Sequence, residues 1–131
     1  EQKRCFSYID DCLSCMIPML DQENLNKQII NVGPDEEFVT VNKVVEICSN
    51  ITGSNLEPIH MADRPQEVKH ATCSADKARK LLNYETKVSL NEGIKQTYEY
   101  IKKRGTKDFD YRLSIEIDND LTPKTWKNKE I

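Results

Sequence analysis

Apolar residues recur every three or four positions in several stretches of the chain, which is the spacing of amphipathic helices. One such stretch follows Thr40, a residue suited to cap a helix, and stops at Gly53. A second stretch follows Ser89 and stops at Gly105. A shorter one predicts a helix from about residue 75 to residue 82. The pattern therefore predicts three helices in the middle and later parts of the chain.

The N-terminal segment predicts a strand followed by a fourth helix. Alternation with aromatic residues from Arg4 to Ile9 is typical of a short strand. The helix is expected to begin at a cap supplied by Asp10 or Asp11. Pro18 falls within its apolar pattern and is expected to kink or shorten it.

Two apolar runs without helical spacing predict further strands. One covers residues 28–32 and ends at Gly33, and the other covers residues 56–61. With about four helices and short strands, residues 1–105 are predicted to form a small α+β domain. Residues 106–131 are polar and are predicted to form a tail on this domain.

Composition excludes some classes of partner. The chain has 131 residues, 37% of them hydrophobic, and a mean hydropathy of −0.69. Basic and acidic residues are interspersed, with a formal net charge of −3, so no nucleic-acid partner is expected. No apolar run approaches the roughly 20 residues that span a bilayer, so no membrane partner is expected.

The five cysteines are odd in number and scattered, which favours reduced thiols and a cytoplasmic location. Cys12 and Cys15, with His70 and Cys73 further along, could supply zinc ligands. Neither pair sits on a tight turn, so Cys12 and Cys15 are expected to be small buried groups on a helix instead. No metal site is predicted, and a zinc-dependent regulatory module is an alternative that metal content would test.

The segment Arg64-Pro65-Gln66-Glu67-Val68 places an arginine and a carboxylate three residues apart on a loop. A guanidinium can bind phosphate oxygens, and a carboxylate can accept hydrogen bonds from ribose hydroxyls. The alternative is an ordinary exposed ion pair, which contributes little to stability.

Four segments of the chain occur in the order and at the spacing of one known family. They are Arg4-Cys5-Phe6-Ser7-Tyr8-Ile9-Asp10-Asp11, Ile30-Asn31-Val32-Gly33, the arginine loop with the following Lys77-Ala78, and Lys87-Val88-Ser89-Leu90-Asn91-Glu92-Gly93-Ile94. On these motifs the chain resembles the C-terminal part of extended short-chain dehydrogenase/reductase enzymes. More narrowly, it resembles the NAD-dependent epimerase/dehydratase family that acts on nucleotide-diphosphate sugars, over roughly residues 3–105.

The resemblance implies a substrate-binding role for four residues. Arg4 and Arg64 would bind the diphosphate of the ligand. Phe6 would lie beside the nucleoside, and Glu67 would accept hydrogen bonds from the ribose. The family's Gly-Asp pair is replaced here by Gln66-Glu67, which removes a flexible residue from the loop and lengthens the carboxylate side chain.

The resemblance also implies a part that this chain lacks. Family enzymes bind NAD through a glycine-rich turn in a Rossmann domain, and the four glycines here are not clustered. Tyr98 and Lys102 match the family's catalytic Tyr-x-x-x-Lys by letter, but the match is interpreted as accidental because no cofactor fold surrounds it. No catalytic and no cofactor-binding residue is assigned. NAD(P) and a Rossmann domain are expected in a longer parent protein, and this chain alone is expected to be inactive and to bind no cofactor.

The hypothesis from the sequence is the nucleotide-diphosphate-sugar-binding part of an NAD(P)-dependent epimerase, with a 4-epimerase as the leading reaction. A 4,6-dehydratase or decarboxylase of the same family is one alternative, and a non-catalytic ligand-binding or interaction module is another. Because the missing Rossmann domain would leave an apolar face uncovered, self-association into a homo-oligomer is also expected.

Overall fold

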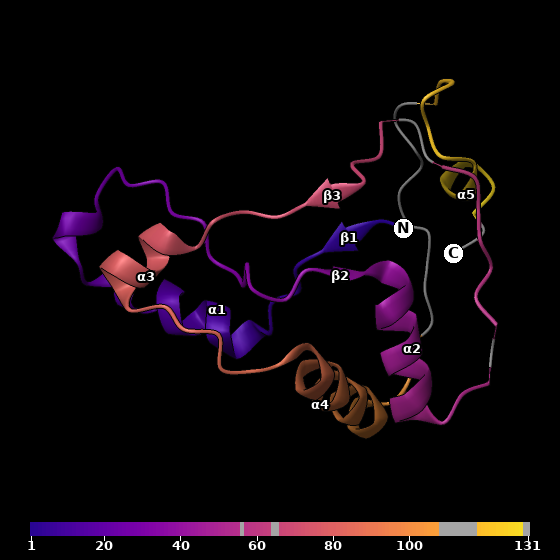
Figure 1. Ribbon diagram of the computed structural model, residues 1–131, viewed down its shortest axis with the longest axis horizontal. Helices are drawn as coiled ribbons and strands as arrows, with labels where there is room; N and C mark the ends of the chain where they lie inside the picture. Colours follow the sequence, from indigo (N-terminus) through magenta and orange to yellow (C-terminus); the bar gives the residue numbers. More distant parts are fainter. Residues whose placement is uncertain (56, 64–65, 108–117, 130–131) are drawn as a thin grey trace.

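The computed structural model describes residues 1–55, 57–63, 66–107 and 118–129. Within these residues the chain forms a three-stranded sheet, five α-helices and two short 3-10 turns (Figure 1). The helices are α1 (Ile9–Met16), α2 (Val41–Thr52), α3 (Asp76–Leu82), α4 (Leu90–Arg104) and α5 (Lys124–Lys127), and the 3-10 turns are η1 (Pro18–Leu20) and η2 (Glu23–Leu25). The predicted α+β class is confirmed.

The sheet is small and is built around the N-terminal strand. Its strands are β1 (Lys3–Arg4), β2 (Val39–Thr40) and β3 (His70–Ala71), in the order β2-β1-β3. Strand β1 pairs antiparallel with β2 and parallel with β3, so that Lys3 lies opposite both Thr40 and His70. The sheet therefore joins three segments that are far apart in the sequence.

The predicted ends of α2 and α4 are confirmed. The Thr40 side chain accepts a hydrogen bond from the backbone amide of Lys43 at 3.1 Å, and α2 stops at Gly53, which adopts a left-handed conformation. The Ser89 side chain accepts from the amide of Glu92 at 3.3 Å, and α4 stops before Gly105.

The first helix differs in part from its prediction. Its N-cap is Tyr8, which makes no side-chain capping hydrogen bond, and Asp10 and Asp11 lie inside the first turn of α1. The helix ends at Met16, and Pro18 then opens the 3-10 turn η1, so the predicted shortening by proline is confirmed. The strand predicted for residues 4–9 is mostly wrong: β1 ends at Arg4, and residues 5–8 have no regular secondary structure.

The two strands predicted from apolar runs are wrong. Residues 28–32 have no regular secondary structure, and the side chain of Ile29 is 85% exposed. Residues 57–61 also have none, with Ile59 87% exposed, and position 56 lies outside the described residues. Among the described residues neither run pairs with a strand, and a strand without a hydrogen-bonded partner has little stability in water.

The helices form two groups, one toward each end of the molecule: α1 with α3, and α2 with α4 (Figure 1). At one end, α1, α3 and the turn η2 enclose a buried cluster. Its members, all less than 9% exposed, are Cys15, Leu25, Ala75, Ala78, Leu82 and Tyr84. At the other end, α2 packs against α4. Among the described residues, no helix is both long and apolar enough to cross a membrane.

A row of apolar side chains on α1 and the turn that follows it remains uncovered. Ile9, Met16, Ile17 and Leu20 are between 53% and 82% exposed. We call these four residues the α1 apolar face. Monomeric proteins seldom expose several large apolar residues next to one another.

Candidate functional site

The structure brings Arg4 and Glu67 together, although 63 positions separate them in the sequence. Arg4 ends β1, and Glu67 lies in the segment that leads into β3. The Arg4 Nη2 donates to the Glu67 Oε1 at 3.3 Å. The two side chains are 25% and 16% exposed, respectively, so the ion pair is partly shielded from water. The parallel pairing of β1 with β3 is what places these residues side by side.

The Arg4 guanidinium makes three further hydrogen bonds, all to backbone carbonyls. Its Nη1 donates to the carbonyl of Lys3 at 2.8 Å and to that of Lys69 at 3.1 Å. Its Nη2 donates to the carbonyl of Val68 at 2.6 Å. We call residues 67–69 the carboxylate segment. Arg4 thus contacts all three residues of the carboxylate segment.

Gln66 adopts the backbone conformation that the family's glycine would adopt without strain. Its φ is +60°, in the left-handed region that costs a residue with a side chain roughly 1 kcal/mol. The loop therefore has a left-handed residue immediately before the carboxylate, at the position where the family's motif has glycine. Arg64 lies outside the described residues, and its predicted role stays a prediction.

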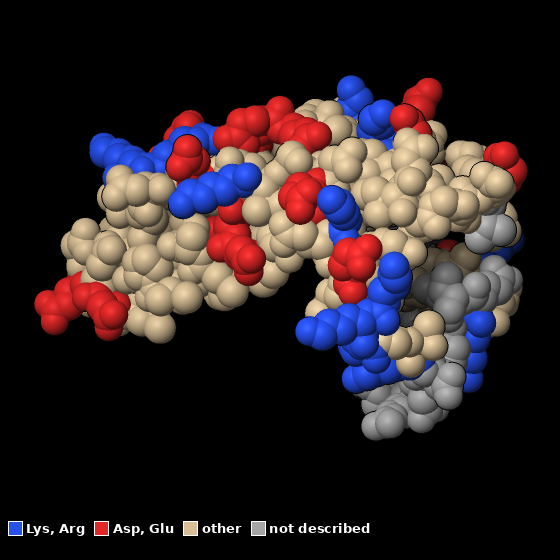
Figure 2. All heavy atoms as spheres, turned by 90° about the horizontal axis from the view of Figure 1, so that it is seen from below, with Lys and Arg blue, Asp and Glu red and all other residues tan. Residues whose placement is uncertain are grey.

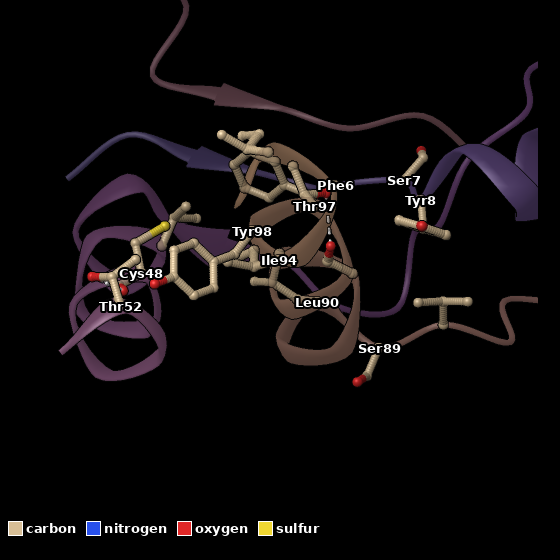
Figure 3. A pocket seen from close by; sticks show the side chains of 14 residues that line it. Phe6, Ser7, Tyr8, Cys48, Thr52, Ser89, Leu90, Ile94, Thr97 and Tyr98 are labelled. Atoms are coloured by element: carbon tan, nitrogen blue, oxygen red, sulfur yellow. Dashed lines mark hydrogen bonds between the residues drawn. The ribbon is translucent and has the colours of Figure 1, made fainter. Parts of the chain in front are cut away.

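Phe6 lies in a different environment from the Arg4–Glu67 pair. It lines an apolar cavity of about 350 Å³ between α2 and α4, which neither Arg4 nor Glu67 lines. In Figure 3 the Tyr98 ring points from α4 toward α2, where Cys48 and Thr52 lie. The full set of lining residues is Phe6, Ser7, Tyr8, Val44, Cys48, Thr52, Val88, Ser89, Leu90, Gly93, Ile94, Thr97, Tyr98 and Ile101.

The Tyr98–Lys102 pair has a simple helical geometry. Both residues are on α4, and the Lys102 ammonium lies 5.3 Å from the centre of the Tyr98 ring. A cation near an aromatic ring at this distance is stabilised by the ring's charge distribution. Tyr98 also lines the apolar cavity between α2 and α4.

Sequence reasoning missed a charged cluster centred on Arg79. This residue on α3 forms ion pairs with Asp35, with Glu36 at 2.6 Å and with Asp76 at 3.0 Å. Asp35 also accepts from the backbone amide of Ala75 at 2.8 Å. We call Asp35, Glu36, Asp76 and Arg79 the Arg79 cluster. Three consecutive acidic residues at 35–37 were the signal in the sequence that could have indicated it.

The Arg79 cluster alters the acidity of its members. Hydrogen bonds from Arg79, followed by that from the Ala75 amide, lower the pKa of Asp35 from 3.8 to about 2. Hydrogen bonds from the same guanidinium lower the pKa of Glu36. The two carboxylates in turn raise the pKa of Arg79, so that it stays charged. The cluster joins the loop at residues 35–36 to α3.

The cysteines show no arrangement typical of a metal centre. Cys15 is fully buried on α1, as predicted, and Cys12 is half-buried. His70 lies on β3 with its ring edge-on to Phe38, at 5.9 Å between ring centres. Within the residues that the structure describes, no three histidine, cysteine or acidic side chains are grouped as metal ligands would be.

Acidic and basic side chains both occur on the face shown in Figure 2.

The fold is that of the C-terminal portion of extended short-chain dehydrogenase/reductase structures. Comparison with known families makes the assignment narrower. The model of the family described as GDP-mannose 4,6 dehydratase matches residues 1–97, and the chain belongs to this family. The predicted resemblance to epimerase/dehydratase enzymes is therefore confirmed.

Individual relatives are enzymes of nucleotide sugars. A UDP-glucuronate 4-epimerase from Thermodesulfobacterium geofontis is 32% identical over 102 residues, which are 78% of this chain and 31% of the relative. Among solved structures, the UDP-glucuronic acid 4-epimerase of Bacillus cereus, in complex with UDP-glucuronic acid and NAD, has a TM-score of 0.72 at 30% identity. The UDP-glucose 4-epimerase of Thermotoga maritima, with UDP-glucose, has a TM-score of 0.72 at 31% identity.

The matched region is a small part of each relative. Both structural matches cover 79% of this chain but only 33% of the solved chain. The chain thus spans about a third of the length of the relatives that it matches.

Proposed function

We propose that this chain is the nucleotide-diphosphate-sugar-binding part of an NAD(P)-dependent sugar epimerase, and that the reaction is epimerisation at carbon 4. Membership of the family and identities of 30–32% to two UDP-glucuronate 4-epimerases and a UDP-glucose 4-epimerase support the proposal. In this reaction a hydride would pass from the sugar to the cofactor and return to the opposite face.

The observation that carries the proposal is the meeting of Arg4 and Glu67 at 3.3 Å. These residues come from two separate family motifs, and the pairing of β1 with β3 supports a role at one site. In the proposed complex Glu67 accepts hydrogen bonds from the ribose, and Arg4 and Arg64 bind the diphosphate. Phe6 is proposed to lie beside the nucleoside, with its ring at the edge of the apolar cavity.

We further propose that the hydride and proton chemistry belongs to a Rossmann domain that pairs with this chain. The α1 apolar face supports this proposal, because its large apolar side chains are exposed and a second domain could cover them. NAD(P) would be bound by that domain rather than by this chain. The cytoplasm is the proposed location, in keeping with five free cysteines.

A second reaction of the same family is a specific competitor. The matching family is described by a 4,6 dehydratase, and a UDP-N-acetyl-alpha-D-glucosaminuronate decarboxylase from Bacillus cytotoxicus is 24% identical over 109 residues. Such enzymes would share the substrate-binding role proposed here. The difference between the reactions would lie in the catalytic groups of the Rossmann domain.

Titration of the chain with UDP tests the binding proposal. NMR chemical-shift changes should show weak, saturable binding, with the largest shifts at residues 66–71. Arg64→Gln should weaken UDP binding about tenfold or more, since a hydrogen bond to a charged group contributes about 1.5–3 kcal/mol. Arg104→Gln, on the last turn of α4, is the matched control and should bind like the wild type. If UDP binds nowhere, or if Arg64→Gln binds it as well as the wild type, the proposal is wrong.

A further inference from the structure

We infer that residues 35–37 are a brace between the two groups of helices: they hold α3 in one group and α4 in the other, and thereby fix the orientation of the groups relative to each other. We call residues 35–37 the brace segment, α1 with α3 the first helix group, and α2 with α4 the second helix group. Only the purpose of the brace rests on the proposed function, in which it would keep the nucleotide-binding sheet in a fixed orientation to the partner domain.

The two helix groups, which lie toward opposite ends of the molecule, do not share one apolar core (Figure 1). Among the described residues, the buried cluster that includes Cys15 and Tyr84 contains no residue of α2 or α4, and neither do the partly buried residues packed against it. The buried side chains of the second helix group, Ile47 and Leu90, lie outside that cluster. Contacts other than a common core must therefore set the orientation of the groups.

The first two residues of the brace segment hold α3. The N-cap of this helix is Ala75, which is fully buried and has no side chain that could cap the helix. The Asp35 carboxylate accepts from the Ala75 amide at 2.8 Å instead. Arg79, on the same helix, donates to Asp35 at 3.2 Å and to Glu36 at 2.6 Å. The brace segment is thus bound to both the backbone and a side chain of α3, and a carboxylate near a helix N-terminus is also favoured by the helix dipole.

The third residue of the brace segment holds α4. The Glu37 Oε2 accepts from the amide of Leu90, the first residue of α4, at 3.2 Å. Next to it, Glu36 accepts from the hydroxyl of Thr86 at 3.2 Å, in the segment that joins α3 to α4. Three consecutive residues therefore bind one helix of each group and the connection between those helices.

The brace segment is itself fixed at both ends. It follows Gly33 and Pro34, which are buried, and Val39, two residues after it, pairs with β1. A helix group that turned relative to the other would therefore break hydrogen bonds of the brace rather than carry it along. Hydrogen bonds to ionised groups are stronger than those between neutral groups, and several carboxylates around one arginine form a network rather than an isolated surface pair.

A second set of contacts between the groups lies at the start of α1. A Cβ added to Gly93 on α4 would lie 3.3 Å from the ring of Tyr8, the residue before α1. Asp11 accepts from the amides of residues 87 and 88, just before α4. These contacts join the groups near one end of α1, so without the brace the groups stay joined there but can turn about that point.

Residual dipolar couplings of the backbone amides measure the orientation of the two helix groups in solution. Leu20→Lys serves as the common background, because it limits self-association through the α1 apolar face. In this background the couplings of both helix groups should fit a single alignment tensor. Adding Glu37→Ala should abolish the common fit and require a separate tensor for each group, while the couplings within each group still fit its own helices.

Variants at the two ends of the brace test whether it acts as one link. Asp35→Ala with Glu36→Ala removes the hold on α3, and Glu37→Ala removes the hold on α4. A link that is cut at either end no longer connects, so each change should abolish the common fit and the triple variant should add nothing further. Glu85→Ala is the matched control, because it removes an exposed carboxylate of the segment between α3 and α4 that makes no hydrogen bond to a described residue. It should keep the common fit.

A single alignment tensor for both helix groups in folded Glu37→Ala would overturn the inference. Loss of the common fit in the triple variant alone would do so too, because the two holds would then act independently. If the change at Asp35 and Glu36 unfolds α3, Glu37→Ala, which alters one exposed side chain, decides the outcome. Failure of the chain to bind UDP would overturn the proposed function but not the brace, which the couplings test without a ligand.

Discussion

The carboxylate of Asp11 accepts a hydrogen bond from the backbone amide of Val88 at 3.1 Å, across 77 positions of sequence. The same Oδ2 atom accepts from the amide of Lys87, also at 3.1 Å, and Asp11 is only 4% exposed. An aspartate in the first turn of α1 thus holds the two residues that precede the cap of α4.

We expect Asp11→Ala to lower the free energy of unfolding by about 1–3 kcal/mol, because two backbone donors lose their acceptor. Asp11→Asn should cost less, since its amide oxygen can still accept from both. Urea denaturation followed by circular dichroism measures the difference. Asp10→Asn is the matched control on the exposed side of the same turn. Equal stability of Asp11→Ala and the wild type would contradict the prediction.

The Arg79 cluster should make the fold sensitive to strong acid. The pKa of Asp35 is about 2 in the folded chain, below its ordinary value of 3.8, so the unfolded chain binds more protons as the pH falls. The stabilisation is complete above pH 4 and is lost as the pH falls through about 2. Melting temperatures measured between pH 5 and pH 2 should decline less steeply for Asp35→Asn than for the wild type.

A second variant, in which an exposed carboxylate is removed, controls the measurement of acid sensitivity. Asp63→Asn removes an exposed carboxylate outside the Arg79 cluster and should follow the wild-type profile. Parallel declines for Asp35→Asn and the wild type would show that the ion pair with Arg79 does not contribute to acid sensitivity.

Replacement of Gly33 by alanine is expected to destabilise the chain for two reasons. Gly33 has a φ of +147°, which side chains disfavour, and an added Cβ would lie 2.9 Å from the Ser7 Oγ. We expect a loss of about 1 kcal/mol or more in the free energy of unfolding. Adding Ser7→Ala should recover part of the loss by removing the close atom, while the backbone strain persists. No recovery in the double variant would mean that contact with Ser7 is unimportant.

The cysteines should react with thiol reagents in the order of their exposure. Cys73 is exposed, whereas Cys15 is fully buried, and burial raises the pKa of the Cys15 thiol. A colorimetric thiol reagent at pH 8 should modify Cys73 first and Cys15 only when the chain unfolds. The Cys73→Ser variant should lack the fast phase. Rapid modification of Cys15 under native conditions would contradict its position in the core.

The α1 apolar face should cause the isolated chain to self-associate. Leu20, at 82% exposure, and Ile17, at 59%, are its most exposed members. Size-exclusion chromatography with light scattering should detect oligomers for the wild type and a shift toward monomer for Leu20→Lys. Ile59→Lys changes an equally exposed apolar residue outside this face and should leave the oligomers intact. A monomeric wild type at all concentrations would contradict the prediction.

The sequence predicted the helices better than the strands, for a physical reason. The limits of α2 and α4 depend on local signals, the capping side chains of Thr40 and Ser89 and the glycines that follow each helix. A strand depends on a partner that can be far away in sequence, which is why residues 28–32 were predicted wrongly and β3 was missed.

The same distinction applies to the candidate site. Arg4 and Glu67 could be singled out by family motif, but their ion pair follows from the pairing of β1 with β3. The residues 10–11 were predicted to cap α1 because aspartate is favoured there, whereas Asp11 instead accepts from Lys87 and Val88. No local rule could identify donors 76 and 77 positions away.

The central place of β1 in the sheet governs the order in which the chain can fold. Strand β1 lies between β2 and β3, and Lys3 pairs with His70 in the parallel ladder. Neither ladder can close until β1 meets a strand that is far away in the sequence, which is a slow step compared with helix formation. The helices α2 and α4 are therefore expected to form early, and the carboxylate segment to reach its final position only when β1 docks.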